Sequence, residues 1–214
     1  MNARSLVALA TVACLATTAC SRTGEIDASG GITAVRTVCP AVGVPAATGD
    51  ITLFDPADNR TADAIDVTAI ITNVRSTCND SADPIVTSIT FDVLARRTRT
   101  DGAREVVLPF FSVVTQGGSV VVAKRVNRVA VRFEPGQARA RSSGVASAYV
   151  TRAAATLPAD IRDQITRERK AGQEDAALDP MTDPTVRTAV TRATFEALVG
   201  FQLTDEQLRY NATR

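Results

Sequence analysis

The 214-residue chain contains no histidine. Catalysis by Ser-His-Asp or Cys-His groups in their usual forms is therefore excluded, as are histidine-ligated zinc and the common non-haem iron sites. Tryptophan is also absent and aromatic residues make up only 4% of the sequence, so stacking surfaces for single-stranded nucleic acid or sugars are poorly supplied. We expect no catalytic residue, no resident metal or cofactor, and no nucleic-acid partner.

Two other groups of polar residues could still do chemistry. An acidic cluster offers oxygen ligands of the kind that calcium prefers; its members are Asp55, Asp58, Asn59, Asp63 and Asp66. The spacing lacks the glycine and the final glutamate of an EF-hand loop, so we expect a solvated loop. Lys124 and Lys170 are the only lysines that could activate a serine, and no serine is singled out beside either. A His-independent hydrolase stays the alternative to a protein without enzymatic activity.

The first twenty residues have the layout of a secretory signal peptide. Residues 1–4 give a short cationic start, residues 5–16 are almost entirely small or apolar, and Thr17-Thr18-Ala19-Cys20 closes the run. The apolar part is about a dozen residues long, whereas a membrane-spanning helix needs roughly twenty. An ordinary cleaved signal with a chance cysteine and a buried N-terminal helix are the alternatives.

The residues before Cys20 resemble the lipobox of bacterial lipoproteins, although that family prefers leucine where this chain has Thr17. The resemblance implies that the signal (residues 1–19) is cut before Cys20, which then carries lipid, and that residues 20–30 form a tether. It also implies a bacterial cell-envelope location with a lipid anchor in the membrane. Ser21 is compatible with delivery to the outer membrane, facing the periplasm. Cys14 also follows small residues and is the second candidate for lipidation.

After such cleavage, Cys39 and Cys78 are the two cysteines that remain in the mature domain. In an oxidising periplasm a lone pair of cysteines usually forms a disulfide. Two free thiols, or half of a metal site, are the alternatives. We expect the disulfide, which would close a loop of about 40 residues and stabilise the fold by roughly 4 kcal/mol through chain entropy.

Charge is distributed unevenly, although the formal net charge is only +1. Residues 21–95 hold four arginines and ten acids, whereas residues 96–152 hold eleven basic residues and three acids. These two blocks could pair as neighbouring strands, or the second could form a basic face for anionic polymers or lipid head groups. The residues of this candidate basic surface are Arg96, Arg97, Arg99, Arg104, Lys124, Arg125, Arg128 and Arg132.

Between residues 31 and 152 the sequence alternates with period two, which places one set of side chains on a buried face. The clearest run extends from Ile85 to Arg96. Asp101-Gly102 predicts a hairpin turn and Gly117-Gly118 predicts another, while Pro109 predicts an edge strand or a bulge. The pattern favours a mainly β fold, an antiparallel immunoglobulin-like β-sandwich of about seven strands.

Beyond residue 152 the pattern changes to helical spacing, which predicts a C-terminal helical segment over residues 153–214. Asp183-Pro184 predicts an N-cap followed by proline at the first helical position. A stripe of small apolar residues then continues to Ala197, with Gly200 as a candidate C-cap. Thr204 to Gln207 form a capping-box pattern that predicts a last short helix.

These observations predict a membrane-anchored envelope lipoprotein that acts as a non-catalytic structural or binding module. Its expected partners are the membrane, reached through the lipid, and an envelope protein or anionic polymer. The first alternative is an accessory subunit of a secretion, pilus or adhesion system, because β-sandwiches bind by edge-strand pairing. An open edge strand would favour that role, and a deep polar pocket would favour the hydrolase.

Overall fold

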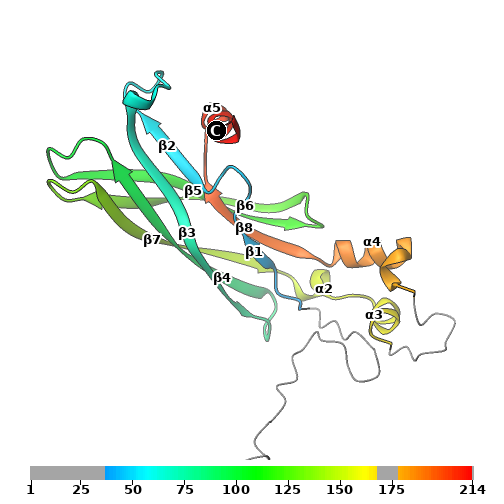
Figure 1. Cartoon of the computed structure of the whole chain (residues 1–214). Helices are drawn as coiled ribbons and strands as arrows, with labels where there is room; N and C mark the ends of the chain where they lie inside the picture. The colour runs from blue at the N-terminus through cyan, green and yellow to red at the C-terminus, as the bar shows by residue number, and fades with distance from the viewer. Residues whose placement is uncertain (1–36, 168–177, 214) are drawn as a thin grey trace, which may run out of the picture. The chain divides into compact units, whose positions relative to one another are not determined.

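The computed structural model describes residues 37–167 and 178–213, which form a two-layer β-sandwich (Figure 1). One sheet has the strand order β1–β8–β5–β6 and the other has the order β2–β3–β4–β7. The strands are β1 Ala41–Gly43, β2 Asp50–Phe54, β3 Ile65–Asn79, β4 Ile85–Arg97, β5 Arg104–Gln116, β6 Val120–Phe133, β7 Arg139–Val150 and β8 Phe195–Phe201. The helices are η1 Ala62–Ala64, α2 Arg152–Ala155, α3 Ala159–Thr166, η2 Pro180–Thr182, α4 Pro184–Arg192 and α5 Asp205–Thr213.

The predicted fold class, a mainly β sandwich with helix at the C-terminus, is confirmed, and the described residues form eight strands in place of about seven. Its likeness to the immunoglobulin fold is one of architecture, because the strand order differs from the ABED and CFG sheets of antibody domains. The sandwich unit comprises Thr37–Arg162 and the described part of Pro180–Arg214. The predicted signal peptide, the tether with Cys20, and the alternative Cys14 lie outside the described residues.

Alternating side chains build the core. In β4 every second residue from Ile85 to Arg97 is buried, as its period-two sequence predicts. The two sheets meet through aromatic side chains, and the rings of Phe91 on β4 and Phe110 on β5 pack edge to face with 5.1 Å between centroids. Burial of such apolar surface is the main force that holds the two layers together.

The prediction that the last sixty residues are helical is wrong in one part. Helix α4 ends at Arg192, and β8 then inserts between β1 and β5. Every second residue of β8 from Phe195 to Phe201 is buried, and residues 195–201 pair antiparallel with β5. The small residues that suggest a continuous helix conceal this short period-two run. The sandwich therefore does not end at residue 152, and Gly200 is a strand residue, not a helix cap.

Of the two predicted hairpin turns, the one at Gly117-Gly118 is confirmed and the one at Asp101-Gly102 is wrong. Gly117 and Gly118, both with positive φ, join β5 and β6 in the expected hairpin. Asp101-Gly102 does not form a hairpin, because β4 and β5 belong to different sheets and the loop between them crosses from one layer to the other.

Pro109 was expected at an edge or a bulge, yet β5 is a central strand between β6 and β8. Pairing of β5 with β8 begins only at Phe110, and the Pro109 carbonyl accepts a hydrogen bond from the Gln202 amide just past the end of β8 (2.9 Å). Pro109 therefore lies just outside the paired residues of β5 and β8, so its missing N–H removes no hydrogen bond from that ladder.

Helices α4 and α5 begin as predicted. The Asp183 carboxylate accepts a hydrogen bond from the Thr185 amide at 2.8 Å, with Pro184 at the first turn. Thr204 and Gln207 form a reciprocal capping box through hydrogen bonds of 2.9 and 3.2 Å. In the described part of the chain, no helix has the length and apolar character needed to cross a membrane.

The predicted Cys39–Cys78 disulfide is confirmed. Cys39 lies just before β1 in one sheet, and Cys78 lies near the end of β3 in the other. Strand β1 pairs with β8 over only three residues. The disulfide therefore joins the two layers where the ladder of hydrogen bonds is shortest.

Candidate functional site

The four edge strands of the sandwich differ in length and in what covers them. β1 has three residues and adjoins the disulfide, and β2 has five. Helix α5 packs beside β2: Tyr210 meets the Phe54 ring edge to face (5.3 Å), and Asn211 donates to the carbonyls of Ala47 and Asp50. The other two edges, β6 and β7, have 14 and 12 residues. Long, uncovered edges are therefore confined to the β6–β7 side of the described sandwich.

The first part of β6 is exposed over nine consecutive residues, 120–128, which we call the edge segment. Only the second part of the strand enters the core, through Val129, Val131 and Phe133. Because successive side chains of a strand point to opposite faces, continuous exposure means that both faces of the edge segment meet solvent. Val120, Val121, Val122 and Val126 contribute most of its apolar surface and are 48–59% exposed.

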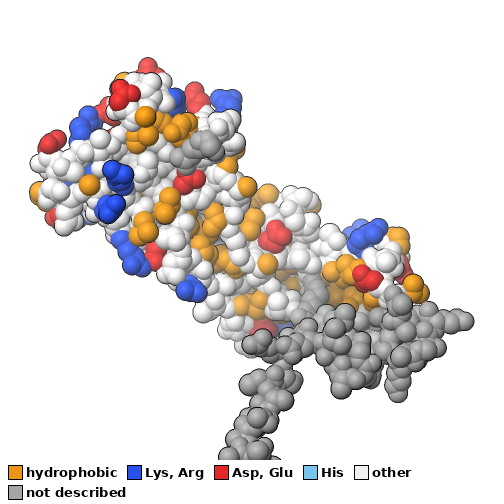
Figure 2. All heavy atoms as spheres, viewed as in Figure 1, with side chains coloured by type: hydrophobic (Ala, Val, Ile, Leu, Met, Phe, Trp, Pro, Cys, Tyr) orange, Lys and Arg blue, Asp and Glu red, His pale blue; other side chains and the backbone are white. Residues whose placement is uncertain are grey.

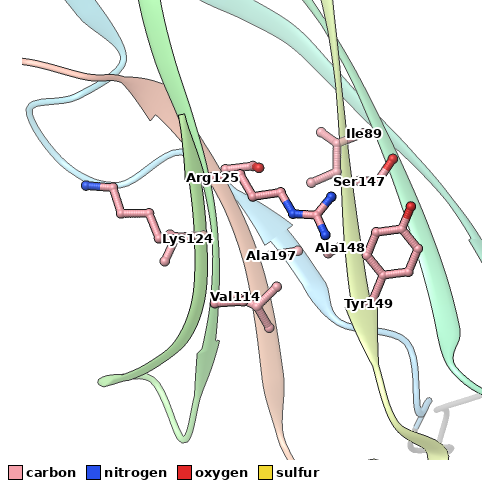
Figure 3. Close-up of a pocket in the computed structure, with 11 residues that line it drawn as sticks. Ile89, Val114, Lys124, Arg125, Ser147, Ala148, Tyr149 and Ala197 are labelled. Atoms are coloured by element: carbon pink, nitrogen blue, oxygen red, sulfur yellow. The ribbon is translucent and has the colours of Figure 1, made fainter. Parts of the chain in front are cut away.

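Cations on this strand lie over aromatic rings on opposite faces. The Arg125 guanidinium lies 5.3 Å from the ring centroid of Tyr149 on β7, across the gap between the two sheets (Figure 3). Lys124 points the other way, with Nζ 5.2 Å from the centroid of Phe111 on β5 (Figure 3). Cation–π contacts of this kind are worth about 0.5–1 kcal/mol at exposed sites, so they hold the two charges close to the strand.

The eight residues of the candidate basic surface do not form one face. Arg97 is the clearest exception: it is 3% exposed, and its guanidinium donates four hydrogen bonds to the carbonyls of Thr100, Gly102, Glu134 and Gln137. It also lies over the Phe133 ring. Its predicted place on the surface is therefore wrong, because carbonyls of the two sheet-crossing loops β4–β5 and β6–β7 converge on it.

Arg99 and Arg104 pair with acids from the first third of the chain. Arg104 forms a two-pronged contact with the buried Asp66 carboxylate at 2.7 and 2.6 Å, and Arg99 pairs with Asp55. The hydrogen bonds from Arg104 lower the pKa of Asp66, outweighing the opposite effect of burial. This arrangement follows the pairing alternative. It also accounts for part of the acidic cluster, since Asp55 and Asp66 already face guanidinium groups, and no metal-holding group of three acids occurs among the described residues.

The remaining basic residues differ in their surroundings. Arg132 pairs with Glu134 at 3.0 Å, and Arg96 is exposed on β4 opposite Arg139 of β7. Lys124, Arg125 and Arg128 form no ion pair with any described residue. On the face seen in Figure 2, basic and acidic side chains are interspersed. Lys124, Arg125 and Arg128 are therefore the unpaired cations of the candidate surface that lie together on one strand, in the edge segment.

The cavity between β6 and β7 does not have the form of an enzyme pocket. Its volume is about 90 Å³, whereas ligand sites usually measure about 300–1,000 Å³. Ser112 and Ser147 line it, but the Lys124 ammonium lies over Phe111, on the opposite face of the sheet from Ser112. A Ser-Lys pair is therefore not assembled there.

The sequence contains a signal for the edge segment that period-two alternation does not capture. Three consecutive valines precede Lys124-Arg125, so charged side chains project from both faces of one strand. A strand with one buried face usually carries its charge on the other face, so adjacent lysine and arginine favour exposure of both faces. Arg96-Arg97 on β4 is an exception, because loop carbonyls bind the buried Arg97. The free edge itself depends on strand order, which the local pattern does not encode.

Comparison of this chain with models of protein families, with curated proteins and with solved structures finds no match.

Proposed function

We propose that this protein is a lipid-anchored module of the bacterial cell envelope that binds a partner protein by strand pairing and catalyses no reaction. The observation that carries the proposal is the edge segment, nine consecutive exposed residues on a free sheet edge. A free edge presents unpaired N–H and C=O groups that pair readily with another strand. Such β-augmentation takes its affinity from main-chain hydrogen bonds and its specificity from side chains.

The composition of the edge segment supports a binding role. Proteins protect edges with short strands, proline, a covering element, bulges or charged side chains such as lysine, and β1 and β2 are protected by their shortness. Residues 120–128 form a long edge that contains no proline and is rich in valine, and its cations and bulge restrict pairing to a strand that supplies the opposite charge. In this role the protein would serve as an accessory subunit of an envelope secretion, pilus or adhesion system.

A lipid on Cys20 completes the proposal, and it rests on the sequence Thr18-Ala19-Cys20 after a short apolar run. The lipid would hold the sandwich at the outer membrane on a short tether, facing the periplasm. Replacing Cys20 with alanine is expected to abolish palmitate labelling and to move the protein to the soluble fraction. Labelling that persists in the Cys20→Ala variant, or that depends on Cys14, would contradict this assignment.

Site-specific photo-crosslinking in intact cells tests the binding role. A photoreactive residue replaces Val122 in the edge segment or, as a matched control, Val107 on β5, since their exposed fractions are 48% and 49%. We expect a discrete adduct from position 122 and none from position 107. Equal adducts from both positions, or none from position 122, would overturn the binding role of the edge.

A further inference from the structure

We infer that the strand bound by β6 is acidic at one end and aliphatic at the other. This inference rests on the proposed function and names the chemistry of its partner. It follows from the order of side chains along the edge segment, where apolar residues 120–122 precede a stretch that contains Lys124, Arg125 and Arg128.

Strands β6 and β7 carry basic residues and no acidic ones. No acidic residue occurs in residues 106–133, which cover nearly all of β5 and the whole of β6, or in residues 139–150 of β7. Glu196 on β8 is hydrogen-bonded to Thr115 and is separated from β6 by β5. The cations of the edge segment therefore lack a carboxylate from neighbouring strands, and a partner that supplies one would gain cross-strand ion pairs.

Each face of the edge segment would contact a different set of the partner's side chains. Arg125 lies toward the gap between the sheets, over Tyr149, and Lys124 lies on the outer face, over Phe111. A strand added beside β6 has side chains that alternate between the same two faces. Acidic residues at successive positions of that strand would then each meet a cation.

The register of β6 divides the edge segment into two parts. Val114 pairs with Ala123 and Thr115 pairs with Val121, so Val122 has no partner on β5 and forms a bulge. From Ala123 to Arg128 the pairing is regular, and this stretch holds all three cations. A partner strand can therefore continue the ladder there with its acidic end, while its aliphatic end covers Val120, Val121 and Val122.

A second copy of the same strand is a poorer partner. Antiparallel registers centred on Lys124 or on Val126 would place Lys124 opposite Lys124 or opposite Arg128. Like charges directly opposite one another destabilise a strand pair. An acidic strand avoids that repulsion and neutralises the same three cations.

The test uses the full chain, purified in a neutral detergent, and fluorescent peptides whose binding is followed by anisotropy. One peptide has successive glutamates followed by successive valines, so that both faces of the added strand carry the same chemistry. A second has the reverse order, and two counterparts carry lysine in place of glutamate. We expect one of the two glutamate peptides to bind and neither lysine peptide to do so. Binding should weaken at high salt, because exposed charges are screened.

Charge reversal locates the binding. Arg125→Glu and Arg128→Glu are each expected to weaken binding of the glutamate peptide about tenfold, since a like charge then faces it. Arg96→Glu is the matched control, an exposed arginine on β4 in the other sheet, and should change binding less than about twofold. Thermal unfolding of each variant checks that the fold is kept, and Lys124→Glu replaces any variant that fails this check.

Several results would overturn the inference. Two concern the peptides: lysine and glutamate peptides bind equally well, or Arg96→Glu weakens binding of the glutamate peptide as much as Arg125→Glu and Arg128→Glu do. A third is that phosphatidylglycerol vesicles, but not phosphatidylcholine vesicles, displace the chain from the peptide. A fourth is the formation of concentration-dependent dimers that Arg125→Glu stabilises or leaves intact. If the glutamate peptides do not bind but the cross-link from position 122 is still observed, only the acidic character of the partner is overturned. Loss of the cross-link overturns the proposed function itself.

Discussion

Asp66 and Arg104 show how one pair of charges links the first and middle thirds of the chain. The Asp66 side chain is 7% exposed and receives two hydrogen bonds from Arg104. Planar guanidinium and carboxylate groups match in this geometry, which makes such contacts stronger than neutral hydrogen bonds. The charge imbalance seen in the sequence is thus partly cancelled inside the fold.

Asp66→Asn is expected to lower the free energy of unfolding by about 2 kcal/mol at neutral pH, because it removes a charge-assisted contact. The pKa of Asp66 is lowered in the folded state, while that of an unfolded aspartate is about 3.9. Its contribution is therefore complete above that value and is lost as pH falls through the folded-state pKa. Urea titrations from pH 7 to pH 2 should show the two proteins converging at acid pH, and a constant difference would contradict this role.

Arg97 tests whether a buried guanidinium holds two loops together. Arg97→Lys should destabilise the fold by about 3 kcal/mol, because one ammonium cannot reach four carbonyls arranged around a planar group. Arg96→Lys is the control, because Arg96 is exposed and its replacement should change stability by less than about 0.5 kcal/mol. Chemical denaturation measures both, and equal midpoints for the two variants would show that the Arg97 contacts are not needed.

At the scale of elements, Gly144 on β7 lies directly opposite Phe91 on β4. A Cβ atom at residue 144 would lie 2.2 Å from the tip of the Phe91 ring, which in turn packs on Phe110 of the other sheet. The absence of a side chain on β7 therefore makes room for the aromatic contact between the layers.

Gly144→Ala is expected to lower the free energy of unfolding by about 1–3 kcal/mol, because the ring must move out of its packing position. Gly102→Ala is a matched control: a Cβ there has no atom within 4 Å, so stability should change by less than about 0.5 kcal/mol. Differential scanning calorimetry of both variants measures the contrast. An unchanged melting temperature for Gly144→Ala would mean that the core adapts around the extra methyl group.

Local sequence patterns predicted some elements well and others poorly. The alternation in β4 and the capping box of α5 could both be predicted from the sequence, because each depends on side chains only a few residues apart. β8 was predicted as helix, since small residues fit either period and only its place between β1 and β5 decides the outcome. Asp101-Gly102 predicts a hairpin from its turn chemistry, but the strands on either side of it belong to different sheets.

At the scale of the whole molecule, the disulfide joins the start of the described chain to the sheet that contains β3. Reduction should lower stability by about 4 kcal/mol through the entropy of the 39-residue loop and lower the melting temperature by roughly 10 °C. Alkylation of the oxidised protein should find no free thiol at Cys39 or Cys78. Full alkylation without reductant, or equal melting temperatures before and after reduction, would contradict this role.

The candidate site was only partly predictable because exposure depends on which strand ends a sheet. Lys124, Arg125 and Arg128 were identified as basic residues from the sequence, but so was Arg97, which the fold buries. The positive charge of an arginine does not show whether its guanidinium binds loop carbonyls or faces solvent. The fold determines this, and the strand order β1–β8–β5–β6 leaves β6 exposed at the edge.

Hydrogen–deuterium exchange measures the proposed backbone pairing most directly. The full chain is compared in native membranes, where its partner is present, and after purification in neutral detergent. If β6 pairs with a partner strand, amides of residues 120–128 should exchange more slowly in membranes, while those of β4, central in the other sheet, should not change. Equal exchange of residues 120–128 in both states, with protection confined to another segment, would contradict the assignment of β6 as the binding edge.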